Sequence, residues 1–254
     1  MSAQNVDLKT GEYSDEAARE FCEAFNFDVA PKIAPADVTA VVLCHNEALR
    51  LPDFLAHHKA AGVGRFIVID NSFDDGSAEI LDADPSVVRL PSAKPYSSYK
   101  SIWRRLVADR YLDGRWCLFI DVDELLIYPG WPEVSLPEYL RDVDKAGFEG
   151  LLSIMVDMYP DCPLSELRYE VGSSMIEAAP FFDVGNYRME LYTPAQLREF
   201  ATPAVHVRGG ARERVFHDQA SRFDSLINHF LIRIFFLIFG VSKALAGSEE
   251  SSIA

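Results

Sequence analysis

Continuous apolar runs alternate with helical patterns between residues 38 and 120. Four runs predict buried strands, at residues 38–43, 65–69, 87–90 and 116–120. Helical spacing predicts three helices between them, at residues 52–61, 77–81 and 98–111. Strands separated by helices form βαβ units with right-handed crossovers. The sequence therefore predicts an α/β protein with a mostly parallel sheet flanked by helices.

The two ends of the chain have different patterns. Residues 1–35 predict a polar tail and a short helix capped by Ser14, ahead of a main domain at residues 36–225. Beyond Pro129 the pattern is less regular, with one further strand expected at residues 151–155. Residues 226–254 predict an apolar C-terminal helix and tail. The dense apolar run at 230–241 is shorter than the ~20 residues of a spanning helix, which favours a core helix or peripheral contact with the inner membrane face.

Composition and charge narrow the class of protein. The chain has 254 residues, 49% of them hydrophobic, as in a folded globular protein. Its formal charge of -15 argues against nucleic acid as a partner, because nucleic acid requires a cationic surface. Cys44 and Cys117 end apolar runs, which favours buried reduced thiols, and the polar N-terminus lacks an apolar signal core. We expect a cytoplasmic protein.

Polar clusters follow three of the predicted strands. They are His45-Asn46-Glu47 after the first strand, Asp70-Asn71-Ser72 after the second, and Asp121 to Glu124 after the fourth. Ligands of parallel α/β sheets bind outside the carboxyl ends of the strands. We expect these clusters to meet at one edge if the strands are neighbours.

Asp121 and Asp123 are the strongest candidates for chemistry. They are two residues apart, so in an extended chain their carboxylates project to the same side and repel each other. A divalent cation relieves that repulsion, and oxygen ligands suit Mg²⁺ or Mn²⁺. The alternative is that Asp121 caps the next turn while Asp123 and Glu124 are solvated.

Three segments together resemble a known family. VVLCHNEALRLPDFLAHHKAAGV, FIVIDNSFDDGSAEIL and WCLFIDVDELL, in this order, resemble the first half of family 2-type glycosyltransferases with the GT-A fold, in a bacterial branch. The resemblance implies a Rossmann-like GT-A sheet followed by a less regular acceptor-side half. It also implies an inverting enzyme that uses Mn²⁺ or Mg²⁺ and a nucleoside-diphosphate sugar donor. The acceptor hydroxyl would belong to a glycan, a lipid-linked or another molecule, as in polysaccharide biosynthesis.

The resemblance also implies roles for individual residues. Asn46 and Glu47 fall in the loop that holds the nucleotide, and Asp70 matches the acidic residue that contacts the base or ribose. Asp121 and Asp123 match the DXD pair, with Asp123 on the metal and Asp121 on the ribose or metal. A metal at this position stabilises the charge of a diphosphate leaving group without proton transfer.

The second half supplies further candidates. LINHFLIR resembles a late family element whose histidine, here His229, is a metal ligand; a structural role for His229 and the rivals His206 and His217 stay open. An inverting transferase needs a general base, for which Asp157 and Asp161 in VDMYPD are candidates, although Asp157 could make structural hydrogen bonds instead. In RGGARERV, Arg208 begins a candidate diphosphate cradle, with a solvated surface turn as the alternative.

Two other functions compete with the glycosyltransferase. DVDELL resembles the nucleophile motif of haloacid-dehalogenase phosphatases, but those enzymes place it on an early strand and need a later acidic pair. Here more than one βα unit precedes the motif, and the only Asp-Asp pair, Asp74-Asp75, lies upstream. Because the C-terminus departs from the family pattern, a noncatalytic relative that binds a nucleotide without turnover stays an alternative.

Overall fold

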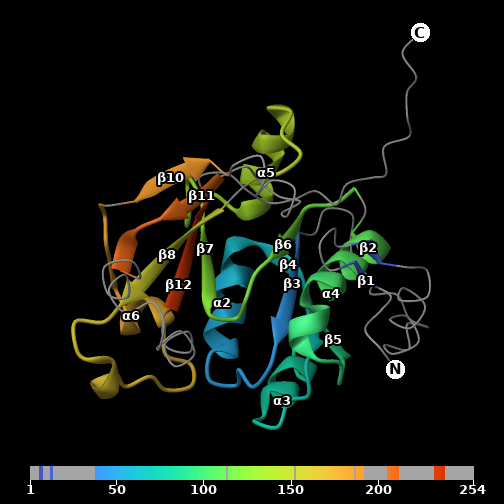
Figure 1. The fold of residues 1–254 in the computed structure, drawn as a ribbon, viewed down its shortest axis with the longest axis horizontal. Helices are drawn as coiled ribbons and strands as arrows, with labels where there is room; N and C mark the ends of the chain where they lie inside the picture. Colours follow the sequence, from blue (N-terminus) through green and yellow to red (C-terminus); the bar gives the residue numbers. More distant parts are fainter. Residues whose placement is uncertain are drawn as a thin grey trace.

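A parallel four-stranded sheet forms the centre of the fold (Figure 1). The computed structural model describes residues 6–7, 12–13, 38–112, 114–151, 153–185, 187–191, 205–211 and 232–237. The sheet has the order β5-β4-β3-β6, and every neighbouring pair is parallel. Its strands are β3 (Val38–Cys44), β4 (Val63–Asp70), β5 (Val87–Pro91) and β6 (Cys117–Phe119). The predicted α/β class and mostly parallel sheet are confirmed.

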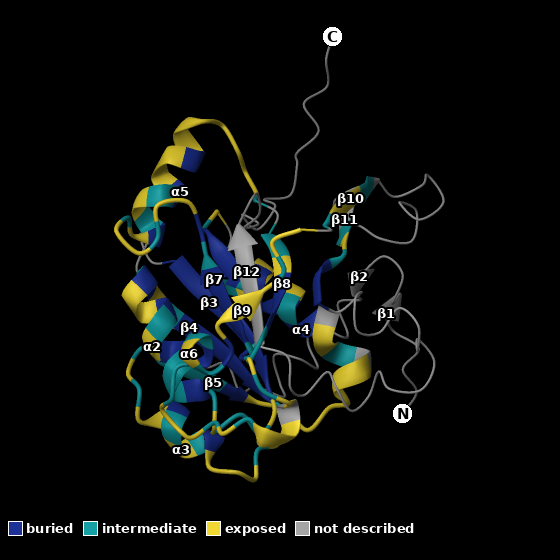
Figure 2. Cartoon of the chain, turned by 90° about the vertical axis from the view of Figure 1, so that its left-hand side faces the viewer, coloured by how far each residue is buried: buried dark blue, intermediate teal, exposed yellow. Residues whose placement is uncertain are grey.

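Helices cover both faces of this sheet, which explains why its strands are mostly apolar. Along β3, Ala40 and Val42 pack in the core that includes residues of α2 (Leu51–Ala61). Val41 and Leu43 point the other way, into a second core with residues of α4 (Tyr96–Tyr111). Neighbouring side chains of a strand point to opposite faces, so a strand covered on both sides has few polar positions. Figure 2 shows these strands as a buried layer inside the molecule.

A second four-stranded sheet follows the first, and the sequence pattern predicted only one of its strands. Its order is β7-β12-β8-β9, from β7 (Glu124–Ile127), β12 (Ile232–Leu237), β8 (Ser153–Tyr159) and β9 (Phe181–Phe182). The strand expected at residues 151–155 is β8, displaced toward the C-terminus. β7 and β9 were not expected. The connection from β6 to β7 links the two sheets and carries the candidate carboxylates.

The predicted C-terminal helix is wrong over residues 232–237, where the chain forms β12. This strand pairs parallel with β7 and antiparallel with β8, and so lies inside the sheet. Its sequence IRIFFL is rich in β-branched and aromatic residues, which favour strands, while an apolar run this short cannot distinguish a strand from a buried helix. The expected membrane contact required a helix, and residues 232–237 form a strand instead.

Two histidines of α2 bond to the outer edge of β7. His57 Nε2 lies 2.8 Å from the carbonyl oxygen of Leu126, and the N–H of Leu126 donates to His58 Nε2 at 3.4 Å. His58 Nδ1 lies 2.8 Å from the carbonyl oxygen of Phe54, so it must carry the proton. His58 is therefore neutral. The two imidazoles take the place of a neighbouring strand and fix β7 to the helix that packs on the first sheet.

The remaining elements are short. They comprise α3 (Ser77–Asp82), α5 (Leu136–Lys145), a 3₁₀ turn (Leu164–Glu166), α6 (Met175–Ala178), and the antiparallel pairs β1 (Val6–Asp7) with β2 (Glu12–Tyr13) and β10 (Arg188–Leu191) with β11 (Val205–Arg208). The helix predicted after Ser14 lies outside the described residues. Among the helices that the structure describes, none has the length and apolarity needed to cross a membrane.

Candidate functional site

The polar strand ends meet at one edge of the parallel sheet, as predicted. β3 lies between β4 and β6, so the ends of these strands are adjacent. The N–H of Asn71 donates to the carbonyl of Cys44 at 3.0 Å, and His45 Nδ1 lies 2.7 Å from the carbonyl of Asn71. The chain runs outward from β3 to β5 and then returns to β6 on the other side of β3. This reversal is a topological switch point, where open α/β sheets form their ligand crevice.

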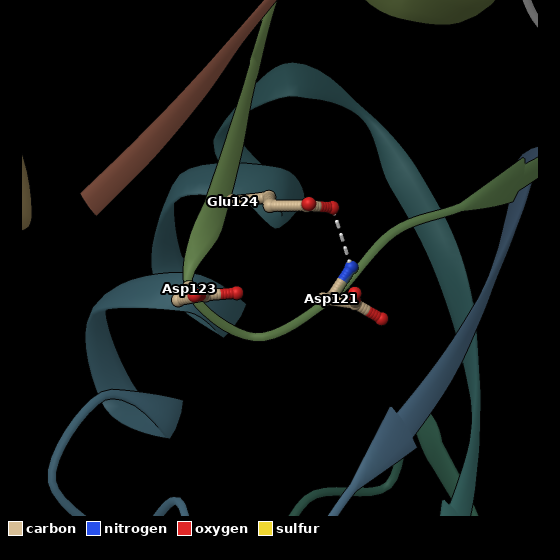
Figure 3. Close-up of side chains that lie close together, drawn as sticks. All are labelled: Asp121, Asp123 and Glu124. Atoms are coloured by element: carbon tan, nitrogen blue, oxygen red, sulfur yellow. Dashed lines mark hydrogen bonds between the residues drawn. The ribbon is translucent and has the colours of Figure 1, made fainter. Parts of the chain in front are cut away.

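Three carboxylates converge directly after β6, at this switch point. Asp121, Asp123 and Glu124 each offer an oxygen, and these oxygens lie within 4.8 Å of one another (Figure 3). The N–H of Glu124 donates to the carbonyl of Asp121 at 3.1 Å, and Glu124 Oε2 accepts from the N–H of Asp121 at 2.8 Å. The expectation that an extended strand aligns Asp121 with Asp123 is wrong, because a turn brings them together. The turn also adds Glu124, which is buried.

Arg104 of α4 is the nearest positive charge to this carboxylate cluster. Its Nη2 lies 2.5 Å from Asp121 Oδ1, and each side chain is about one-third exposed, at 31% and 32%. Tyr96, in the first turn of the same helix, lies within the electrostatic field of the carboxylate cluster. Burial and the charge of Asp121 raise the pKa of Tyr96, and Arg104 partly opposes this shift. One helix thus contributes a phenol and a guanidinium to the site.

Arg50, just before α2, is a second cation beside the site. Its Nε lies 2.6 Å from Glu47 Oε2, and its Nη2 donates to Glu47 Oε1 at 3.0 Å, which makes a bidentate pair. Burial disfavours the charge of Arg50, but the hydrogen bond to Glu47 and the fields of Glu47 and Asp123 outweigh it and raise its pKa. Glu47, predicted to hold the nucleotide, therefore also orients a cation near Asp123.

Asn46 and Asp70 make structural contacts in the loops after β3 and β4. Asn46, at a φ of 55°, exchanges two hydrogen bonds with Asp74: its Nδ2 donates to the carboxylate, and its Oδ1 accepts from the N–H at 3.0 Å. Asp70 is buried, accepts from the N–H of Phe73 at 3.1 Å and pairs with Arg89 Nη1 at 2.8 Å. These bonds give Asn46 and Asp70 defined positions at the edge of the crevice; the nucleotide contacts expected of them stay predictions.

Asp157 lies in the same row of the second sheet as Glu124. Both residues are in register with Arg233 on the strand between them, so they share one face of the sheet. Strands are spaced roughly 4.8 Å apart, which places the two backbones about 10 Å from each other. Asp157 is 8% exposed. Asp161 is exposed in the loop that follows β8.

The other predicted residues of the second half do not join the carboxylate cluster in the described structure. Arg208 is exposed on β11 and pairs with Glu190 across the β10–β11 hairpin, with 3.3 Å between Nε and Oε2. A side chain at Gly210 would approach Tyr187 Oη to 2.5 Å, so packing alone accounts for this glycine of the predicted cradle. His229 lies outside the described residues, and its role as a metal ligand stays a prediction.

A cavity of about 590 Å³ lies beside the second sheet, on the face opposite Glu124 and Asp157. Ile127, Ile154 and Val156 form one wall, and Tyr187, Met189 and Val207 of the hairpin region form another. Ile154 and Val156 alternate with Asp157 along β8, so they face the other way. The cavity is therefore separate from the carboxylate cluster.

The donor set fits a hard divalent cation. All three groups of the carboxylate cluster provide oxygen, which suits Mg²⁺ and Mn²⁺ rather than metals that prefer nitrogen or sulfur. From the sequence we identified Asp121 and Asp123 and expected Arg104 to be solvated or paired with acidic neighbours, but we assigned no role to Glu124 or Tyr96. Helical spacing could have linked Tyr96 to Arg104, because Tyr96, Lys100 and Arg104 recur every four residues and so lie along one side of α4.

Comparisons with known proteins give no further identification. A scan against protein-family models produced no match, and a search of the curated proteins produced none. The functional argument therefore rests on the residues of this chain and their geometry.

Proposed function

We propose that this protein is a metal-dependent glycosyltransferase with a GT-A-type fold, which moves a sugar with inversion from a nucleoside-diphosphate donor to an acceptor hydroxyl. The observation that carries the proposal is the convergence of Asp121, Asp123 and Glu124 at the topological switch point of the parallel sheet. The ordered sequence resemblance across β3–α2, β4–α3 and β6 adds support. The free thiol of Cys44 is consistent with a cytoplasmic enzyme.

The carboxylate cluster would hold Mn²⁺ or Mg²⁺, and the bound ion would neutralise the charge that develops on a diphosphate leaving group. The protein's own groups would orient the donor around that point. Asn46 and Glu47 begin the loop after β3, and Asp70 ends β4, so a nucleotide lying across these strand ends would contact both. Arg50 would add positive charge on the same side, close to Asp123.

Asp157 is our choice for the general base. It shares a face and a register row with Glu124, about 10 Å away between backbones. Asp161, exposed in the following loop, is the second candidate. A base on the acceptor side removes the hydroxyl proton as the new glycosidic bond forms.

Release of nucleoside diphosphate from UDP-, GDP- and CDP-sugars, measured with and without Mn²⁺, tests the proposal. We expect Mn²⁺-dependent release from one donor, and a loss of at least about 100-fold in Asp123→Ala. Asp109→Asn is the matched control, because it also removes one negative charge but from an exposed pair with Arg105 on α4. Metal-independent release would refute the metal role.

The same assay distinguishes the rival functions. A phosphatase of the haloacid-dehalogenase type would hydrolyse a simple phosphate ester in a reaction that requires Asp121. Binding of a nucleoside diphosphate without release from any donor sugar would identify a noncatalytic nucleotide-binding protein.

A further inference from the structure

The guanidinium of Arg104 places a positive charge against the carboxylate cluster. Its guanidinium contacts Asp121 through Nη2 alone, and both side chains are about one-third exposed. Its Nε is shielded from solvent and has no hydrogen-bond partner among the described residues. A bidentate arginine–carboxylate pair would use two donors. The contact with Asp121 is therefore a single-donor pair that leaves part of the bonding capacity of Arg104 unused.

The position of Arg104 follows from the helix that carries it. Tyr96, Lys100 and Arg104 lie along one side of α4, and the Lys100 ammonium lies 5.7 Å from the centre of the Tyr96 ring. At the start of this row, the negative charges of Asp121, Asp123 and Glu124 all raise the pKa of Tyr96. Arg104, two turns further on, ends the row in direct contact with Asp121. The helix thus holds a positive charge at the carboxylate cluster.

We propose that Arg104 is a built-in counter-ion that competes with the divalent cation and so sets the metal affinity of the carboxylate cluster. This inference rests on the proposed metal site. A guanidinium on Asp121 offsets part of the negative charge that attracts a cation, and metal binding through Asp121 must break or weaken this pair. Because two unit charges a few ångströms apart near a protein surface interact appreciably even when solvent partly screens them, removal of this guanidinium should change metal affinity by on the order of tenfold.

The chain offers a matched control one residue away. Arg105 also lies on α4 but pairs with Asp109, at 3.5 Å between Nε and Oδ2, within the helix. Arg105→Gln and Arg104→Gln change the net charge equally, and both keep a good helix former. Only Arg104→Gln removes the contact with Asp121. A difference between these two variants therefore reports the local pair and not the overall charge.

The test is calorimetric titration of Mn²⁺ alone into the full chain, as wild type, Arg104→Gln, Arg105→Gln and Arg104→Lys. We expect Arg104→Gln to bind Mn²⁺ about tenfold more tightly than wild type. Arg105→Gln should stay within about twofold of wild type, and Arg104→Lys, which keeps the charge, should lie between wild type and Arg104→Gln. Thermal unfolding of each variant without metal verifies that it is folded.

The outcomes separate this inference from the proposed function. Wild type that binds Mn²⁺ with the same or higher affinity than Arg104→Gln overturns the counter-ion role and leaves the metal site intact. Absence of Mn²⁺ binding in wild type together with binding in Arg104→Gln supports the counter-ion role in its strongest form. Absence of binding in all folded variants overturns both the counter-ion role and the metal site.

Discussion

Asp121 and Glu124 are joined by two hydrogen bonds that close the turn between the two sheets. The N–H of Asp121 donates to the Glu124 carboxylate at 2.8 Å, and the N–H of Glu124 donates to the Asp121 carbonyl at 3.1 Å (Figure 3). Glu124 is 3% exposed. Its carboxylate therefore both shapes the turn and adds charge to the carboxylate cluster.

Glu124→Ala should lower the free energy of unfolding by about 1–3 kcal/mol, because it leaves the N–H of Asp121 without its acceptor. Glu124→Gln keeps an acceptor oxygen and should lose less than half as much. Urea denaturation of the two variants measures both values. Equal losses would show that the charge of Glu124, and not its hydrogen bond, holds the turn.

His58 should make folding sensitive to pH. Burial, with a smaller contribution from His57, lowers the pKa of His58 from 6.5 to about 3. The unfolded chain therefore takes up a proton at a higher pH than the folded one, so stability is full above about pH 6.5 and is lost as the pH falls toward 3. The loss amounts to about 1.4 kcal/mol per pH unit.

Comparison with His58→Gln isolates this effect from other titrating groups. Wild type should be the more stable protein at pH 7.5, since the glutamine cannot reproduce both bonds of the imidazole. Its advantage in urea denaturation should shrink steadily between pH 6 and pH 4. A difference in stability that does not change with pH would contradict the assignment of a neutral His58.

The ion pair of Asp70 with Arg89 should be worth more than that of Asp82 with Arg89. The side chain of Asp70 is 6% exposed and that of Asp82 is 55% exposed, and both contact the same guanidinium. Arg89→Met breaks both pairs and leaves Asp70 buried without its cation, so it should cost about 3 kcal/mol, the low end for a broken buried pair. Asp82→Asn removes only an exposed partner and should cost below about 1 kcal/mol. Similar losses in chemical denaturation would contradict this ranking.

Gly62 ends α2 at a point where the next part of the chain packs closely. It has a φ of 102°, and an added Cβ would lie 2.7 Å from Pro137 Cδ at the start of α5. Gly76 has a similar φ of 92° but nothing within 4 Å of such an atom. Gly76→Ala should therefore cost only about 1–2 kcal/mol of backbone strain, and Gly62→Ala about 1–3 kcal/mol more. Equal thermal destabilisation would show that Pro137 moves aside freely.

The first half of the fold could be predicted because its signals are local. The strands β3 and β4 are continuous apolar runs, and α2 ends at a glycine, so each element is specified by its own residues and its immediate neighbours. Burial on both faces, visible in Figure 2, is what makes these runs continuous. The meeting of the strand ends then followed from the topology of βαβ units.

The second half could not be predicted because its pairings are long-range. β12 inserts between β7 and β8, more than 70 residues away in sequence, and the apolar run at 232–237 does not reveal these partners. β7 has only four residues and begins at Glu124, directly after Asp123, so its apolar pattern is too short to be recognised in the sequence. An apolar segment of this kind forms a strand when two open strand edges are available.

The candidate site was partly predictable for a similar reason. The proximity of Asp121 and Asp123 was correct, but its cause is the turn to Glu124 and not strand alternation. The contact of Arg104 with Asp121 spans 17 positions and depends on how α4 packs beside β6. Charge pairing between a helix and a strand end requires the tertiary structure, which sequence spacing does not supply.

The central claim is that the carboxylate cluster binds a nucleoside diphosphate through a divalent cation. The most direct measurement is thermal unfolding of wild type and Asp123→Ala with UDP, GDP or CDP, each with and without Mn²⁺. The account predicts that one nucleoside diphosphate stabilises wild type only when Mn²⁺ is present, and that Asp123→Ala abolishes this stabilisation. Stabilisation that persists in Asp123→Ala, or that is equal with and without Mn²⁺, would contradict it.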